Sequence, residues 1–295
     1  MTADKPSRVT GFSRRRVLKL GAAAGLACVP PAIYAFGIEP VWLRTVSVDV
    51  PVRDLPAAFA GYRIAQISDL HWGCGVSADQ IEEAVSLALE GGPDLIALTG
   101  DFLHRGGDTG DAERVAGLLR RLSANDGVVA VLGNHDHDVY RSGGGAPAYD
   151  KSSRLRTALA ARGIDVLEDR TRTVKRGDAA IQVAGFGDLW AGRFDSTAGA
   201  PAEGAVSIAL SHNPDTAPDL WRAGHRLILS GHTHGGQVCV PFLGPPILPV
   251  ALREFAAGLY ERADRHLYVN RGVGWLARVR CFVRPEVTLL TLRTA

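Results

Sequence analysis

The stretch RIAQISDLH occupies residues 63–71 and joins an apolar run to two residue types that bind metals. Its first part, residues 63–68, is short and rich in strand-forming side chains, which is typical of a buried strand. Asp69 and His71 follow where that strand would leave the sheet, and a sheet holds such side chains rigidly. Because alternate residues of an extended chain point the same way, we expect Asp69 and His71 to reach one metal centre.

Further apolar runs along the chain end in polar residues of the same chemical kind. The segments that follow these runs are Gly100-Asp101, Gly133-Asn134-His135-Asp136, Ser211-His212-Asn213-Pro214 and Gly231-His232-Thr233-His234. Glycine permits the tight turns and close backbone approach that such a site needs. Carboxylate, imidazole and amide ligands together suit Zn, Fe, Mn or a mixture of them. Each segment alone could be an ordinary turn, but their joint occurrence after apolar runs predicts a metal site.

The remaining sequence alternates strand-like and helix-like segments. We expect strands at 46–50, 63–68, 94–99, 128–132, 180–186, 206–210, 226–229, 267–270 and 287–292. We expect helices at 78–89, 112–122, 152–161 and 216–222, and a surface loop in the glycine-rich stretch 141–147. With 295 residues, 46% of them hydrophobic, the chain can bury a full core without disulfides. The alternation predicts a layered α/β fold.

Residues 1–37 differ from the rest in charge and pattern. They hold six basic residues and one acidic residue, and SRRRVLK at 13–19 precedes an uncharged run at 20–36. This arrangement resembles a twin-arginine export signal, in which Val17 replaces the usual Phe. A basic arm before a core helix is the alternative, but Pro30-Pro31 would break that helix. The run is shorter than the ~20 residues of a typical membrane span, yet it could stay uncleaved as a membrane anchor.

We therefore expect residues 1–37 to direct export through the twin-arginine machinery. Residues 38–295 would form the working domain, in the periplasm or elsewhere in the cell envelope. This domain holds 27 basic and 30 acidic residues, a net charge of −3. General nucleic-acid binding needs clustered Lys and Arg, so we expect no nucleic acid among the partners.

The four cysteines of the chain, Cys28, Cys74, Cys239 and Cys281, form no CxxC pair. Cys74 and Cys239 each follow a histidine-rich motif closely, so they could lie near each other in space. The sequence leaves open whether these two residues pair, although buried or free thiols are favoured over a disulfide.

Taken together, the motifs resemble those of the calcineurin-like metallophosphoesterase superfamily. They are Asp69-x-His71, Gly100-Asp101, Gly133-Asn134-His135-Asp136, His212 and Gly231-His232-Thr233-His234. Its exported bacterial branch with twin-arginine signals is suggested by Ser211-His212-Asn213-Pro214, His232-Thr233-His234-Gly235-Gly236-Gln237, Asn270-Arg271-Gly272-Val273-Gly274 and Pro285-Glu286. The resemblance spans roughly residues 62–292. It implies an α/β fold of two mixed β-sheets packed as a sandwich and flanked by helices.

The resemblance also implies a role for each residue of the motifs. Two divalent metal ions (Mn, Fe or Zn) would be bound, the first by Asp69, His71 and His234 and the second by Asn134, His212 and His232. Asp101 would bridge both metals, and His135 would approach the scissile phosphate and assist the leaving oxygen. Metal-activated water would then attack phosphorus in line, with no covalent enzyme intermediate.

One position departs from the pattern of related phosphatases. They often carry an Asp three residues after the bridging Asp, paired with the catalytic His, whereas this chain has His104 there. Purple acid phosphatases would need Tyr at the same position, so His104 argues against that branch. Support for His135 would then come either from Asp136 or from a main-chain carbonyl.

Residues 238–250 form an apolar, proline-rich run beside His232 and His234, and Trp72 directly follows His71. This run either packs beneath the site or forms an apolar lip that suits a lipid-linked substrate at a membrane surface. The exported branch is also similar to enzymes that hydrolyse UDP-2,3-diacylglucosamine. An exported address counts against that substrate, since UDP-linked lipid precursors are cytoplasmic, and a periplasmic phosphodiesterase or phosphomonoesterase is the main rival.

Arg271 and Arg280 are either phosphate contacts or members of surface ion pairs.

A metal-binding envelope protein without turnover is the alternative to an enzyme. The complete ligand set together with His135 argues against that alternative and favours a two-metal phosphoesterase.

Overall fold

The computed structural model describes residues 29, 31–104, 110–142 and 152–295. Most of the predicted signal at 1–37, and most of the predicted loop at 141–147, lie outside these residues. Within the described part of the chain, no helix combines the length and the apolar character needed to cross a bilayer.

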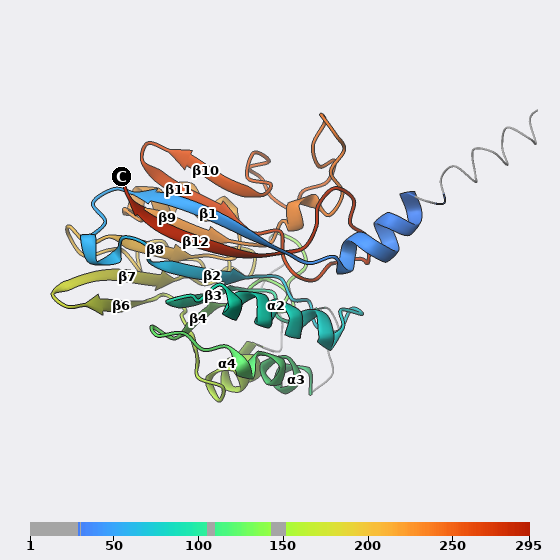
Figure 1. Ribbon diagram of the computed structural model, residues 1–295, viewed down its shortest axis with the longest axis horizontal. Helices are drawn as coiled ribbons and strands as arrows, with labels where there is room; N and C mark the ends of the chain where they lie inside the picture. Colours follow the sequence, from blue (N-terminus) through green and yellow to red (C-terminus); the bar gives the residue numbers. More distant parts are fainter. Residues whose placement is uncertain (1–28, 30, 105–109, 143–151) are drawn as a thin grey trace, which may run out of the picture.

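Six strands form a first, mixed sheet in the order β1-β12-β2-β3-β4-β5 (Figure 1). Their bounds are Arg44–Val52 for β1, Glu286–Thr294 for β12, Arg63–Ile67 for β2, Leu95–Thr99 for β3, Val128–Val131 for β4 and Ile164–Val166 for β5. Strands β2 to β5 run parallel, with Ile67 opposite Leu98 and Thr99 opposite Val131. The segments after β2, β3 and β4 therefore leave the sheet at the same edge.

The second sheet is also mixed, with the order β10-β11-β9-β8-β7-β6. Its bounds are Gly258–Arg262 for β10, Arg265–Val269 for β11, Leu227–Ser230 for β9, Ser207–Leu210 for β8, Ala179–Gly185 for β7 and Arg170–Arg176 for β6. The four central strands are parallel and the two edge strands are antiparallel. The expected fold of two mixed sheets is confirmed.

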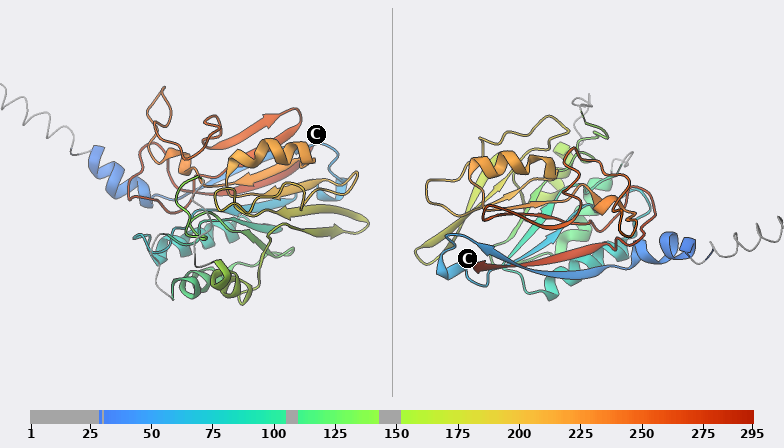
Figure 2. Two further views of the ribbon diagram at one scale, coloured as in Figure 1. Left: turned by 180° about the vertical axis from the view of Figure 1, so that it is seen from behind. Right: turned by 90° about the horizontal axis from the view of Figure 1, so that it is seen from above.

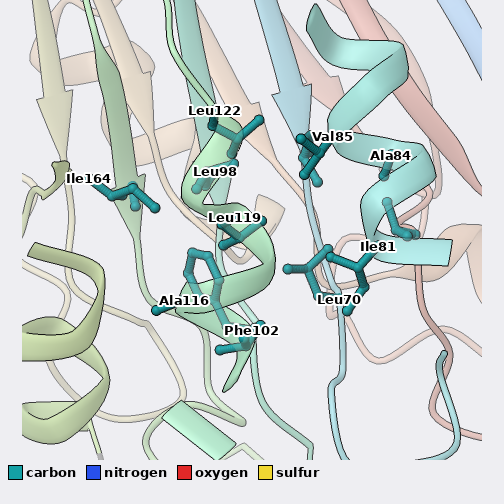
Figure 3. Close-up of a cluster of buried hydrophobic side chains, with 14 of the residues drawn as sticks. Leu70, Ile81, Ala84, Val85, Leu98, Phe102, Ala116, Leu119, Leu122 and Ile164 are labelled. Carbon is teal, nitrogen blue, oxygen red and sulfur yellow. The ribbon is translucent and has the colours of Figure 1, made fainter. Parts of the chain in front are cut away.

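Among the residues that the structure describes, four helices flank the two sheets. They are α2 (Ala78–Glu90), α3 (Asp111–Leu118), α4 (Ser152–Ala160) and α5 (Ala217–Ala223). Helices α2, α3 and α4 cover the outer face of the first sheet, where Ile81 and Val85 of α2 pack in the same cluster as Leu98 of β3 (Figure 3). Helix α5 covers the outer face of the second sheet (Figure 2). Short helical turns occupy Tyr34–Ile38, Glu39–Val41, Ala57–Phe59, Leu119–Arg121, Pro214–Thr216 and His234–Gly236.

The inner faces of the sheets form the central core of the molecule. Ile64 of β2 and Val129 of β4 share one buried cluster with Val183 of β7 and Ile208 of β8. These strands are buried on both faces and therefore read as continuous apolar runs in the sequence. That continuity is why the sequence predicts them.

Three strands escape prediction from the sequence. Strand β5 has only three residues, β6 reads RTRTVKR, and β10 reads GLYER. Strands β5, β6 and β10 each form one edge of a sheet. Polar and charged side chains are common on edge strands because they oppose pairing with other chains, and they remove the apolar signal.

The segment before β1 is bound to the loop that precedes β12. The amide of Arg280 donates to the carbonyl of Ala35 at 2.9 Å. The Glu39 carboxylate is fully buried and accepts hydrogen bonds from the amides of Phe282, at 2.8 Å, and Val283. These contacts hold the start of the described chain against a segment more than 240 residues later.

Candidate metal centre

The predicted ligands all lie at one edge of the sandwich, between the two sheets. Asp69 and His71 follow β2, Asp101 follows β3, Asn134 follows β4, His212 follows β8, and His232 and His234 follow β9. Each of these side chains is buried, with at most 4% of its surface exposed. Parallel strands of both sheets end here, which is how residues far apart in the sequence meet.

The ligand atoms fall into two groups that share a boundary. Donor atoms of Asp69, His71 and His234 lie within 4.8 Å of one another, and so do those of Asp101, His212 and His232. Asp101 Oδ2 lies 3.1 Å from His212 Nε2 and 3.5 Å from His71 Nε2, so it touches both groups. This is the position that a carboxylate bridging two cations would occupy.

The backbone around these ligands differs from the extended chain that we expected for Asp69-x-His71 and His232-x-His234. Asp69 and His71 have φ of 54° and 49°, and His232 and His234 have φ of 70° and 50°. This left-handed conformation is unfavourable for residues with a side chain and clusters at functional sites. The expectation of extended backbone is therefore wrong, because tight turns aim both side chains of each motif at the site.

Hydrogen bonds between neighbouring strand ends hold these turns. The amide of Asp69 donates to the Gly100 carbonyl at 2.9 Å, and the amide of His71 donates to the Asp101 carbonyl at 3.0 Å. Asp101 itself has φ of 54°. The turns after β2 and β3 are thus joined by hydrogen bonds, which stabilise their unfavourable backbone conformations.

Glycine is needed where strand ends approach most closely. A Cβ atom on Gly231 would lie 2.0 Å from Ser68 Oγ and 2.2 Å from an Asp69 carboxylate oxygen, and one on Gly133 would lie 2.2 Å from Asp101 Oδ1. These distances are far below van der Waals contact. The predicted need for glycine beside the ligands is thereby explained.

Carbonyl groups select the tautomers of two histidines. His212 Nδ1 lies 2.7 Å from the Thr99 carbonyl, and His232 Nε2 lies 2.9 Å from the Pro249 carbonyl. A carbonyl only accepts, so these ring nitrogens carry hydrogens. The other two nitrogens, His212 Nε2 and His232 Nδ1, lie 3.2 Å apart and would be the atoms that bind a cation. Such partners orient the histidine ligands of metal sites.

Asn134 keeps its amide oxygen free of protein hydrogen bonds in the part of the chain that the structure describes. Its Nδ2 donates to the Val139 carbonyl at 2.6 Å, and its buried Oδ1 has no hydrogen-bond partner among the described residues. Buried polar atoms are rarely left unpaired without a functional reason. The ligand types, the converging nitrogens and this free oxygen all fit divalent cations of the Mn, Fe or Zn class.

The electrostatics of the site also favour cation binding. Burial lowers the pKa of His71 and His234 well below the ordinary value and lowers that of His232 to about 3, so these rings are neutral. Burial opposes ionisation of Asp101, but His212 and His135 hold the pKa of Asp101 well below its usual range. Burial raises the pKa of Asp69 to about 7. Burial also lowers the pKa of His212, but Asp101 raises it well above the ordinary value. Metal binding would therefore release the protons of His212 and Asp69, because metal ligands must be deprotonated.

His135 lies directly against the ligand groups. Its backbone amide donates to Asp101 Oδ1 at 2.9 Å. Its ring is stacked on His104, with centroids 5.3 Å apart and planes 23° apart, and meets His71 edge-on at 4.7 Å. His104 Nδ1 is 3.2 Å from His71 Nδ1. His104, the residue that departs from the family pattern, therefore contacts both the predicted ligand His71 and the predicted catalytic residue His135.

The Asp136 side chain, which the sequence suggested as a possible support for His135, hydrogen-bonds to backbone amides. Its two carboxylate oxygens accept from the amides of Leu103, at 3.0 Å, and Gly133, at 2.9 Å. Burial raises the pKa of Asp136 to about 8. The carboxyl group braces the turns after β3 and β4, and it positions His135 through the backbone.

Asp188 and Trp190 belong to the surroundings of the site, although sequence reasoning missed them. Asp188 is 1% exposed, its Oδ1 accepts from the Ala191 amide at 2.8 Å, and its Oδ2 has no hydrogen-bond partner within the described residues. Burial raises its pKa to about 6, and His212 acts in the opposite direction. Trp190 meets the His232 ring edge-on at 4.5 Å. The sequence signal that could have identified Asp188 is the Gly187-Asp188 pair, which directly follows an apolar strand. It was overlooked because no histidine lies near this pair in the sequence.

The two arginines considered as phosphate contacts have internal partners. Arg280 is fully buried and donates to the carbonyls of Gly274, at 2.5 Å, and Arg271, at 2.8 Å. Arg271 pairs with the buried Glu286 carboxylate at 2.5 Å. Both guanidinium groups organise the loop between β11 and β12.

The described cysteines are free thiols. The Cys74 thiol donates to the carbonyls of His71, at 3.2 Å, and Trp275, at 3.0 Å. The Cys239 amide donates to the Cys281 carbonyl at 2.9 Å. The sequence favoured free or buried thiols over a disulfide, and this prediction is confirmed for the described cysteines.

Comparison with known proteins agrees with this geometry. Residues 62–236 match the family described as calcineurin-like phosphoesterase. Phosphodiesterase YaeI of Escherichia coli is 33% identical over 282 residues, covering 95% of this chain and 99% of that protein. The uncharacterized metallophosphoesterase YkuE of Bacillus subtilis is 32% identical, covering 96% and 98%. The UDP-2,3-diacylglucosamine pyrophosphatase LpxG of Chlamydia muridarum is 28% identical, covering 88% and 92%.

The family typically binds divalent metals, and this chain has buried groups of Asp and His side chains that could hold them. Sequence motifs, two-sheet fold, site geometry and relatives agree, so the protein is a metal-dependent phosphoesterase. The chain belongs to the calcineurin-like phosphoesterase family.

Proposed function

We propose that this enzyme uses two divalent cations to hydrolyse a phosphodiester or pyrophosphate, and that its substrate is lipid-linked. The observation that carries the proposal is Asp101, whose carboxylate touches both ligand groups. Relatives named as a phosphodiesterase and as a UDP-2,3-diacylglucosamine pyrophosphatase support this bond type. The lipid pyrophosphate UDP-2,3-diacylglucosamine is the leading specific candidate. The export proposed below counts against it and favours its rival, a phosphate ester or phosphodiester outside the cytoplasm.

Cations of this kind supply Lewis acidity to a phosphoryl group and to water. The residues of the chain provide the remaining parts of the reaction. Asp101 and the histidine ligands hold the reacting groups in a dry, fixed arrangement, because all of them are buried on strand ends. His135, on the accessible side of the ligands, donates a proton or a hydrogen bond to the leaving oxygen.

The test uses the full chain, stripped of metal and reloaded with Mn, Zn or Fe. Hydrolysis of bis-p-nitrophenyl phosphate should depend on metal. Asp101→Ala should lose both bound metal and turnover. His135→Ala should keep its metal but lose about 10²–10⁴-fold in kcat, the usual contribution of a general acid.

Asp178→Ala is the matched control, since Asp178 is exposed at the β6–β7 turn. It should behave as the unchanged chain. Full metal loading without turnover on this diester or on p-nitrophenyl phosphate would refute the proposal in favour of a non-catalytic metal-binding envelope protein.

We further propose that the protein works outside the cytoplasm after export by the twin-arginine machinery. The SRRRVLK segment at 13–19 and the uncharged run at 20–36 support this. Replacing Arg14 and Arg15 by Lys should retain the protein in the cytoplasm on cell fractionation. Unchanged distribution in that variant would contradict export by this route.

A further inference from the structure

Exposed large apolar side chains gather at one end of the molecule. In the part of the chain that the structure describes, every such residue except Leu259 lies in one of three segments, 29–42, 240–247 and 276–282. Phe242, Leu243 and Ile247 are 107%, 84% and 76% exposed. Single exposed apolar residues are common, but a gathering of this kind marks an interaction site.

The three segments form one surface. The Cys281 amide donates to the Gln237 carbonyl at 2.9 Å, which joins the loop after β11 to the loop after β9. The Arg280 amide donates to the Ala35 carbonyl at 2.9 Å, which adds the helical turns before β1. Figure 1 shows the three segments together at the end of the molecule opposite the β6–β7 hairpin. We call this surface the apolar end.

Apart from the buried Glu39, the charged residues of the apolar end are all basic. Residues 236–253 and 271–285 contain no Asp or Glu but carry five arginines: Arg253, Arg271, Arg278, Arg280 and Arg284. Arg278 is exposed, and the Arg284 guanidinium lies over the Trp42 ring at 3.8 Å from its centroid. Apolar side chains edged by arginine suit an anionic lipid surface, where each basic residue adds attraction to the headgroups.

A cavity of about 420 Å³ opens within the apolar end. Val238, Ile247 and Leu276 line it, together with Thr233, which lies between the ligands His232 and His234. Pro249, another lining residue, accepts the hydrogen bond from His232. An apolar chain in this cavity would bring an attached phosphate next to the ligand groups.

The chain also enters the described structure at this end. Residue 29 begins the apolar end, and the uncharged run 20–36 leads into it. A chain held at a membrane by that run would present the apolar end to the same bilayer. The direction of chain entry therefore favours a lipid bilayer over a protein partner as the occupant.

We infer that the apolar end docks on a lipid bilayer and passes an acyl chain of the substrate into the cavity. Phe242, Leu243 and Phe282 insert among the lipid chains, and Arg278 and Arg284 meet anionic headgroups. The docking surface rests on the exposed side chains, the arginines and the point of chain entry, and it does not depend on the proposed function. The acyl-chain cavity rests on the proposed function, because it concerns the substrate of that site.

Insertion is measured by tryptophan fluorescence on the full chain with phosphatidylglycerol vesicles that contain brominated phosphatidylcholine. Phe242→Trp should add emission that bromine quenches, relative to the unmodified chain. Asp178→Trp, at the opposite end of the molecule, should add emission that is not quenched. Equal quenching of the two variants would overturn the docking surface, and so would a vesicle-independent dimer that Phe242→Ser abolishes.

The cavity is tested with water-soluble p-nitrophenyl alkyl phosphodiesters. Replacing the methyl ester by the octyl ester should raise kcat/KM at least tenfold, and Ile247→Asp should bring that ratio toward one. A ratio near one in the unchanged chain would overturn the acyl-chain cavity. Failure to hydrolyse even the methyl ester would instead refute the proposed function and leave the vesicle result standing.

Discussion

At Asp101 one side chain connects both halves of the site. Its Oδ2 contacts His212 and His71, and its Oδ1 accepts from the His135 amide. The sequence predicted the ligand because Gly100-Asp101 follows an apolar strand. It did not predict the hydrogen bond to His135, because that bond depends on how the turn after β4 folds back over β3.

A buried histidine outside the site makes stability depend on pH. Burial lowers the pKa of His225 to about 4, and its Nδ1 lies 2.9 Å from Ser207 Oγ. The unfolded chain has a histidine pKa near ~6.5, so between these values only the unfolded state takes up the proton. This contribution to stability is present above about pH 6.5 and is lost as pH falls toward 4.

We expect His225 to contribute a loss of about 2 kcal/mol in the free energy of unfolding between pH 7 and pH 5. The measurement is denaturant unfolding at both pH values for the unchanged chain and for His225→Asn. Between pH 7 and pH 5 the free energy of unfolding of the variant should fall by about 2 kcal/mol less than that of the unchanged chain. The same loss in both proteins would contradict the assignment.

At the scale of elements, the strand ends and their glycines decide the geometry of the site. Strands β2, β3 and β4 end level with one another, and the turns that follow are held by hydrogen bonds between neighbours. The apolar runs predicted these strands. The left-handed turns were mispredicted as extended chain, since turn conformation depends on the neighbouring strand end as well as on local sequence.

Gly231→Ala should disrupt the site without removing a ligand. The new Cβ would lie 2.2 Å from an Asp69 carboxylate oxygen, so that side chain must move. We expect loss of bound metal, measured by elemental analysis, and loss of diester hydrolysis. Retention of both would mean that the turn after β9 can shift at little cost.

Gly117→Ala is the matched control for this substitution. Gly117 lies in helix α3, and nothing lies within 4 Å of where its Cβ would be. Alanine favours a helix over glycine by about 0.5–1 kcal/mol. Metal content and activity should be unchanged and stability slightly raised.

At the scale of the whole molecule, the site joins the two sheets. Asp69, His71, Asp101 and Asn134 belong to strand ends of the first sheet, and His212, His232 and His234 to strand ends of the second. A cation bound by the proposed ligands would therefore link both layers of the sandwich, and only in the folded state. Binding of that kind stabilises the folded protein by mass action.

Removal of metal should lower the free energy of unfolding by about 3 kcal/mol when free metal is a hundredfold above its dissociation constant. The measurement is unfolding of metal-loaded and chelator-treated protein. Asp101→Ala, which lacks the bridging carboxylate, should show little difference between the two conditions. A loaded, unchanged chain that is insensitive to the chelator would show that the cations do not link the sheets.

The sequence by itself determined the buried strands and the family, and it predicted the order of the metal ligands along the chain. These features are local, because each ligand directly follows an apolar run that forms its own strand. Only the tertiary structure decided the turn conformations, the contacts of His104 and Asp136, the presence of Asp188 beside His212, and the apolar end. Each of these depends on segments far apart in the chain, such as Ala35 and Arg280, whose contact no local pattern encodes.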